Sequence, residues 1–174
     1  ARTVARATAK PAPAKAAKRA KSAGGSVEQQ LAAIERGGGD GTVTITRGTA
    51  LNVSSLGKIY FPADGFTKGD LMRYYARVAS HILPVIADRP LVLKRTPEGI
   101  TGETFFQQKP PEHAPSVVRI ETVVNDDGVR QPRITGGDLA TLLYTVQIGC
   151  VSVDPWFSRV QSLDDMDYAI LDLD

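Results

Sequence analysis

The sequence predicts an α+β fold in which a mixed or antiparallel sheet is flanked by helices. Residues 42–46 alternate polar and apolar side chains, as a half-buried strand does. Residues 71–85 repeat apolar side chains at spacings of three and four, as one face of a helix does. Residues 117–134 form a strand, turn and strand pattern, and such a hairpin argues against a purely parallel sheet.

Two helix starts are marked by capping residues. Thr67 and Asp70 form a capping-box pattern at the start of the first helix, and Asp138 can cap the second. The first helix is predicted to bury a stripe of Leu71, Tyr75, Val78, Ile82 and Val85. The second is predicted to bury Leu139, Leu142, Leu143 and Val146. Strands over 91–95 and 168–174 and a turn over 96–99 complete the expected elements.

The formal charge of +2 averages two unlike regions. Residues 1–36 carry a net charge of +6, whereas residues 37–174 carry −4. The basic balance therefore belongs to the N-terminal segment and does not by itself indicate a nucleic-acid surface on the globular part. Six aspartates gather within residues 154–174, against the single base Arg159.

The first 40 residues are predicted to be a basic linker, with the folded domain over 41–174. Residues 1–25 consist of Ala, Lys, Arg, Pro, Ser, Thr and Gly with a single Val, and such a segment buries too little apolar surface to fold. A short helix is expected over 26–36, ended by the glycines at 37–39. The linker either attracts phosphates or acts as a solubilising spacer, and composition does not separate the two.

Two classes of protein are excluded at this stage. A lone Cys150 rules out a disulfide framework and a cysteine-based zinc site, and it fits a reducing compartment. No apolar run reaches the roughly 18 residues of a membrane span, so no membrane partner is expected.

The sharpest chemical feature is the Asp-Leu-Asp at 172–174. If the segment is a strand, Asp172 and Asp174 share one face, about 6.5–7 Å apart at Cα. Two such carboxylates repel unless a cation lies between them, and Mg²⁺ or Mn²⁺ prefers oxygen ligands. Metal ions held there would suit nucleotidyl transfer. A solvated strand end is the alternative, and the motif alone does not decide between them.

Seven further segments, in order along the chain, resemble one family. They include Leu-Gly-Lys-Ile-Tyr-Phe-Pro at 56–62, Gly-Phe-Thr-Lys-Gly-Asp at 65–70 and Pro-Trp with Ser-Arg at 155–159. The others lie within 88–99, 102–106, 113–115 and 138–142. Over about residues 51–174, the chain resembles the primase-polymerase domain of bacterial ligase D, a module of non-homologous end joining in the archaeo-eukaryotic primase superfamily.

The resemblance implies roles for particular residues. Asp172 and Asp174 would be the catalytic metal ligands, for Mn²⁺ or Mg²⁺. Lys58 and Lys68 match lysines that hold the 5′-phosphate of a DNA end, with solvated lysines as the alternative. The roles of two further positions rest on the same resemblance. Phe105 and Phe106 match an aromatic pair that stacks near the templating base, with ordinary core aromatics as the alternative.

The implied partners are 5′-phosphorylated DNA ends and nucleoside triphosphates. Ligase and phosphoesterase domains of a parent chain, and the Ku end-binding protein, would follow from the same resemblance. The implied location is the bacterial cytoplasm, at the nucleoid.

Two departures bear on activity. Asp154 stands where the family usually has a His that contacts the incoming nucleotide, and a carboxylate repels a triphosphate unless a metal intervenes. Family domains also continue well past residue 174, so we expect an N-terminal portion with little or no polymerase activity alone. The alternatives are a non-catalytic module that binds 5′-phosphate ends and an inactive fragment.

Overall fold

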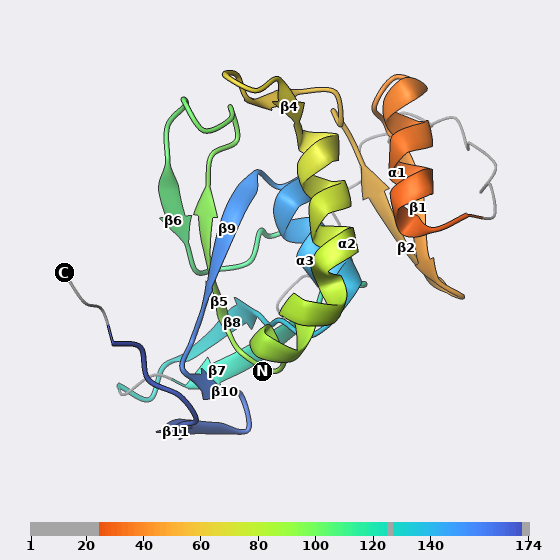
Figure 1. Ribbon diagram of the computed structural model, residues 1–174. Helices are drawn as coiled ribbons and strands as arrows, with labels where there is room; N and C mark the ends of the chain where they lie inside the picture. Colours follow the sequence, from red (N-terminus) through yellow and green to blue (C-terminus); the bar gives the residue numbers. More distant parts are fainter. Residues whose placement is uncertain (1–24, 125–126, 172–174) are drawn as a thin grey trace, which may run out of the picture.

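The computed structural model describes residues 25–124 and 127–171. Within these ranges, three helices and eleven short strands form a mixed α+β fold in which every strand pairing is antiparallel. This confirms the predicted fold class. Helix α2 runs through the middle, between α1 with β1 and β2 on one side and β5, β6 and β9 on the other (Figure 1).

All three helices begin at a side-chain cap. Helix α1 spans Val27–Arg36 behind Ser26, α2 spans Lys68–Ile86 behind Thr67, and α3 spans Leu139–Gln147 behind Asp138. Ser26 and Thr67 each complete a reciprocal capping box, which satisfies backbone donors at the helix start. The helix starts predicted at Thr67 and Asp138 are therefore confirmed.

The strands form one three-stranded sheet and four two-stranded ribbons. The sheet has the order β6-β5-β9, formed by Phe105–Gln107, Leu91–Arg95 and Cys150–Pro155. The ribbons are β1 with β2 (Gly41–Thr46, Thr49–Val53), β3 with β4 (Ile59–Phe61, Phe66–Thr67), β7 with β8 (Ile120–Val124, Arg130–Ile134) and β10 with β11 (Ser158–Arg159, Ser162–Met166).

Helix α1 belongs to the folded body, so the domain boundary predicted at residue 41 lies too far along the chain. Leu31 is fully buried in the main core, and α1 packs against α2. The Gln30 side chain also bonds the backbone of Thr44 in β1, at 2.9 Å to its N–H and 3.1 Å to its oxygen. Residues 1–24 of the predicted linker lie outside the described residues.

The buried stripe of α2 differs from the prediction at its far end. Val85 is 57% exposed, whereas Met72, Ala79 and Ile86 are buried. Met72, Ala79 and Ile86 are seven residues apart and share one face of the helix, so the buried stripe is centred one position further along the chain than predicted. Val85 lies about 100° around the helix from Ile86, which places it outside that stripe.

The predicted strand over 168–174 is wrong for the part that is described. Residues 168–171 are irregular, because Tyr168 packs on Phe157, with ring centroids 5.2 Å apart, instead of joining a sheet. Residues 172–174 lie outside the described residues. Among those described, no helix is long and apolar enough to cross a membrane.

Candidate nucleic-acid interface

Lys58 is held at the surface by one carboxylate. It precedes β3, its side chain is 34% exposed, and its Nζ lies 2.7 Å from Oε2 of Glu98. Glu98 belongs to the predicted turn at 96–99, which lies directly on β3, since Ile100 N–H donates to the Tyr60 oxygen at 2.9 Å. Gly99 makes this approach possible, because a Cβ there would lie 3.0 Å from that same oxygen. Lys58 is therefore an accessible cation whose partner Glu98 is 75% exposed.

Lys68 points into the body, unlike Lys58. It is the first residue of α2 and only 5% exposed, and its ammonium donates to the backbone oxygens of Ser54 at 3.0 Å and Gln147 at 2.8 Å. Burial, and next the nearby charge of Lys58, lower the pKa of Lys68 to about 8. The Gln147 side chain in turn bonds both the backbone N–H and the hydroxyl of Ser54. Lys68 thus joins the ends of β2 and α3 to the start of α2.

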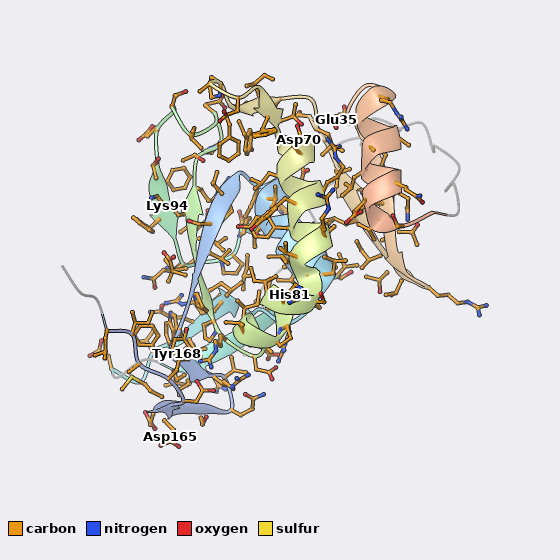
Figure 2. All side chains as sticks on the ribbon, viewed as in Figure 1. Glu35, Asp70, His81, Lys94, Asp165 and Tyr168 are labelled. Carbon is orange, nitrogen blue, oxygen red and sulfur yellow. The ribbon has the colours of Figure 1, made fainter. Side chains whose placement is uncertain are left out.

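A charged network fixes the start of α2 against α1. Arg73 bridges Asp70, at 2.6 Å, and Glu35 of α1, and the Thr67 hydroxyl donates to Glu35 at 2.6 Å. Desolvation would raise the pKa of Asp70, but hydrogen bonds from Thr67 and Arg73 hold it below its usual value. Figure 2 shows Glu35 and Asp70 close together where α1 and α2 adjoin. The network determines where Lys68 enters the body.

Phe105 and Phe106 do not form one stacking platform. Side chains alternate along the edge strand β6, so Phe106 shares a face with its neighbour Lys94, and Phe105 shares the opposite face with Arg95. The Arg95 guanidinium lies 5.1 Å from the centre of the Phe105 ring. Phe106 is 63% exposed and Phe105 40% exposed, so the alternative that both are core aromatics is wrong.

Asp154 lies on the same outer face of the sheet as Phe106. It pairs with Val92 across β5 and β9, and Lys94 is two residues further along β5. Asp154 is one of the residues that line a shallow hollow of about 440 Å³, together with Trp156, Phe157 and Met166 among others. One face thus carries an aromatic ring, a cation and a carboxylate.

The predicted metal ligands Asp172 and Asp174 lie outside the described residues. Over residues 25–124 and 127–171, no group of three or more His, Cys, Asp or Glu side chains could hold a metal ion. The chain leading towards them is anchored at Asp167, which pairs with the buried guanidinium of Arg89 and with Arg159. These two arginines, Arg89 first, lower the pKa of Asp167, and Arg89 also lies 4.5 Å from the Tyr168 ring centre.

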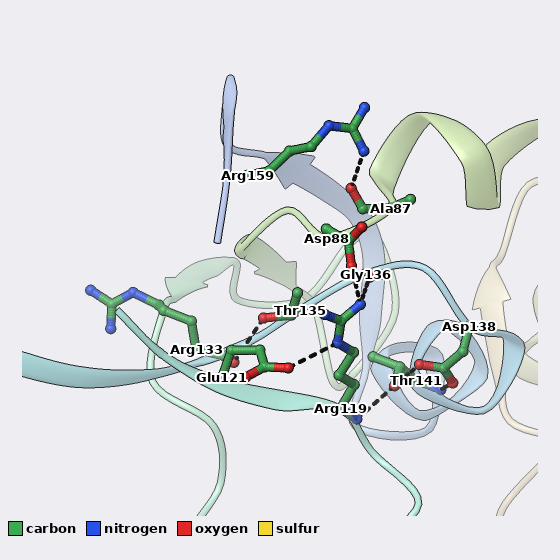
Figure 3. A network of polar contacts seen from close by, with 10 residues as sticks. All are labelled: Ala87, Asp88, Arg119, Glu121, Arg133, Thr135, Gly136, Asp138, Thr141 and Arg159. Atoms are coloured by element: carbon green, nitrogen blue, oxygen red, sulfur yellow. Dashed lines mark hydrogen bonds and ion pairs between the residues drawn. The ribbon is translucent and has the colours of Figure 1, made fainter. Parts of the chain in front are cut away.

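A second polar network joins the end of α2 to α3 and β7 (Figure 3). Arg119 pairs with Asp88, at the end of α2, and with Glu121 at 3.1 Å. Its backbone N–H donates to the Thr141 hydroxyl at 2.8 Å, and that hydroxyl donates to the capping residue Asp138. Hydrogen bonding to Arg119 lowers the pKa of Asp88. The network positions α3, whose last residue receives the Lys68 ammonium.

The comparisons with known proteins agree with this architecture. Residues 67–174, more than half of the chain, match the family described as "LigD, primase-polymerase domain". The chain belongs to this family. Its fold is similar to a solved structure, "Polymerase Domain from Mycobacterium tuberculosis Ligase D in complex with DNA", with a TM-score of 0.58 and 29% identity, covering 63% of this chain and 38% of that one.

Two sequence relatives are bacterial LigD proteins. The chain is 29% identical over 129 residues to the multifunctional non-homologous end joining protein LigD of Pseudomonas aeruginosa, which covers 71% of this chain. It is 34% identical over 94 residues to the bifunctional LigD of Bacillus subtilis, which covers 54% of it. Each match spans only 15% of the relative, so this LigD-family chain corresponds to a small part of those proteins.

Several residues of the site have no signal in the sequence. The turn at 96–99 was predictable, but nothing local indicates that it folds onto β3 and delivers Glu98 to Lys58. Arg133 was also missed: it is 6% exposed, its Nε has no hydrogen-bond partner, and no carboxylate of the described chain pairs with it.

Proposed function

We propose that this LigD-family chain binds DNA ends in bacterial non-homologous end joining, as part of a domain that transfers nucleotides to DNA 3′ ends. The observation that carries the proposal is Lys58, a surface ammonium whose ion-pair partner within the described residues is the solvent-exposed carboxylate of Glu98, which a phosphate can replace. Family membership and the likeness to a polymerase domain solved in complex with DNA support it.

Two lysines divide the work of holding a 5′-phosphate in this proposal. Lys58 contacts the phosphate as a point charge. Lys68 does not contact the phosphate in this proposal, because its ammonium already donates to the backbone oxygens of Ser54 and Gln147. It adds positive electrostatic potential at the site while it is protonated. Phe106 offers the exposed ring on which a base of the template strand can stack.

The chemical step belongs to residues beyond the described body. We assign Asp172 and Asp174 to a Mn²⁺ or Mg²⁺ ion, which would activate the attacking hydroxyl and neutralise the triphosphate of the incoming nucleotide. Asp154 would face that nucleotide only across such a cation, since a bare carboxylate repels phosphate. Ku, and ligase and phosphoesterase domains, are further proposed partners.

End recognition is tested by fluorescence anisotropy with duplexes that differ only in a 5′-phosphate or 5′-hydroxyl. We expect the wild type to prefer the phosphorylated end and Lys58→Gln to lose that preference. Arg47→Gln is the matched control, because Arg47 is an exposed cation in the β1–β2 turn. Equal affinity of the wild type for the two ends would overturn end recognition.

The second candidate is an end-binding module without catalysis. It is favoured by the placement of Lys58 and Phe106 on the described body, apart from the proposed metal ligands. Primer extension with Mn²⁺ separates the two candidates. Synthesis that Asp172→Asn abolishes supports the polymerase, and end binding without synthesis supports the module.

A further inference from the structure

A groove of about 450 Å³ lies between the first turns of α2 and the β3–β4 hairpin, and none of the residues assigned to DNA lines it. Its apolar walls are Phe61 and Phe66 of the hairpin and Leu71 and Tyr74 of α2. The two phenylalanine rings meet edge to face, with centroids 6.5 Å apart. Phe66 and Tyr74 are each more than half exposed. Large apolar side chains that face water around a hollow of this size are typical of a binding site.

One cation of this groove is open to a ligand. Arg73 is engaged by Asp70 and Glu35, whereas Arg77, one turn further along α2, is 71% exposed. Its ion-pair partner within the described residues is Glu28 of α1, whose Oε1 lies 3.7 Å from the Arg77 Nε. This distance is longer than a hydrogen bond, and a loose ion pair at the surface contributes little stability. Arg77 can therefore exchange Glu28 for a carboxylate that a ligand brings.

The charges decide which kind of molecule fits the groove. The phosphates of a nucleic acid would meet the carboxylates of Asp64, exposed in the hairpin turn, and Asp70, and a single open arginine does not outweigh them. The chain's own residues 1–24 contain seven Lys and Arg, no acidic residue and one Val, so Arg77 repels them and they offer little to fill the groove. An acidic segment of another protein satisfies both the rings and the arginine.

We propose that this groove docks a partner protein through a short acidic segment of that partner. One bulky apolar side chain of the segment packs against Phe66 and Tyr74, and a neighbouring carboxylate pairs with Arg77. Tyr74 and Arg77 are three residues apart, about 4.5 Å along the helix axis, so the two partner residues lie within about one helical turn of each other. Aromatic residues and arginine are also the types that contribute most at protein–protein contacts. The inference goes beyond the proposed DNA-end function and does not depend on it.

The test selects peptides on the wild-type chain from a phage-displayed library of random sequences and measures their binding by fluorescence anisotropy. We expect the selected peptides to share an aromatic or branched apolar residue with Asp or Glu close by. Arg77→Glu and Tyr74→Ala should each weaken binding by about tenfold or more. Arg47→Glu, the same charge change at an exposed position in the β1–β2 turn, should not. A peptide whose acid is replaced by Lys should bind Arg77→Glu better than the wild type, which a merely structural role of Arg77 would not produce.

The inference is overturned if no peptide is enriched, if the enriched peptides lack an acidic residue, or if they bind Arg77→Glu and Tyr74→Ala as tightly as the wild type. It is also overturned if single-stranded DNA displaces the peptides and Arg77→Glu weakens DNA binding more than Arg47→Glu does, because the groove would then belong to a nucleic acid. Tyr74 and Arg77 are exposed, so unchanged thermal unfolding would show that the variants are folded. If Arg77→Glu unfolds at a lower temperature, Arg77→Gln replaces it, because glutamine does not repel Glu28.

Discussion

Replacing Lys68 with methionine should change how the stability of the fold depends on pH. Burial lowers the pKa of this ammonium from 10.5 to about 8, so the unfolded chain binds a proton that the folded chain has already released between those pH values. The penalty for burying the charged form is complete below about pH 8 and disappears as the pH rises towards 10.5. Stability contributed by Lys68 therefore increases with pH across this window.

The magnitude follows from the size of the shift. A difference of 2.5 units between 10.5 and about 8 corresponds to about 3 kcal/mol in total, of which about 2 kcal/mol falls between about pH 7.5 and pH 10. Cys150 and Tyr75 act in the opposite direction, because burial raises the pKa of each to about 12 and the unfolded chain loses these protons first. Both are present in the wild type and the variant, so they cancel in the difference.

The assay is urea unfolding of the wild type and Lys68→Met at several pH values over that window. We expect the wild type to gain about 2 kcal/mol on the variant between the two ends of the range. Lys94→Met is the control, since Lys94 is exposed, and should track the wild type. A stability difference between wild type and Lys68→Met that stays constant with pH would refute the reasoning.

The other predictions concern the Lys58 ion pair, the turn that carries it, helix α1 and the Asp167 ion pairs. Glu98→Gln should raise the affinity for 5′-phosphorylated DNA by about threefold in anisotropy, because it frees Lys58; a gain that persists in the Lys58→Gln background would contradict this. Gly99→Ala should destabilise the fold by about 1–3 kcal/mol in urea, since Gly99 has φ 90° and no room for a Cβ; wild-type stability would argue against the docked turn. Leu31→Ala should lower the free energy of unfolding by about 2–5 kcal/mol in the same measurement, and unchanged stability would contradict the assignment of α1 to the folded body. Asp167→Asn should flatten the loss of stability on acidification, because the wild type loses the Asp167 pairing with Arg89 as the pH falls through the lowered pKa.

The parts of the fold that could be predicted depend on neighbouring residues. Thr67 and Asp70 are three residues apart, and a capping box needs nothing more, so the start of α2 was correct. The hairpin of β7 and β8 is equally local. The burial of Lys68 could not be predicted, because one of its acceptors is Gln147, 79 residues further along the chain. No pattern around residue 68 contains that partner.

The candidate site shows the same division. Lys58 could be singled out from the sequence, but its pairing with Glu98 spans 40 residues and depends on where the turn docks. The treatment of Phe105 and Phe106 as a pair came from the family resemblance alone. The period of a strand already implies opposite faces for adjacent residues, and the structure agrees with the strand rule.

The bonds among Ser54, Lys68 and Gln147 also have a consequence for the order of folding. They close loops of 14, 79 and 93 residues. The two longer loops both end at Gln147, so those bonds can form only after α3 has been synthesised. On a ribosome, the loop that carries Lys58 is synthesised early, but its neighbour Lys68 acquires both acceptors only after residue 147 has emerged. Long-range closures of this kind form slowly, so the surface proposed to meet a DNA end is completed among the last parts of the body.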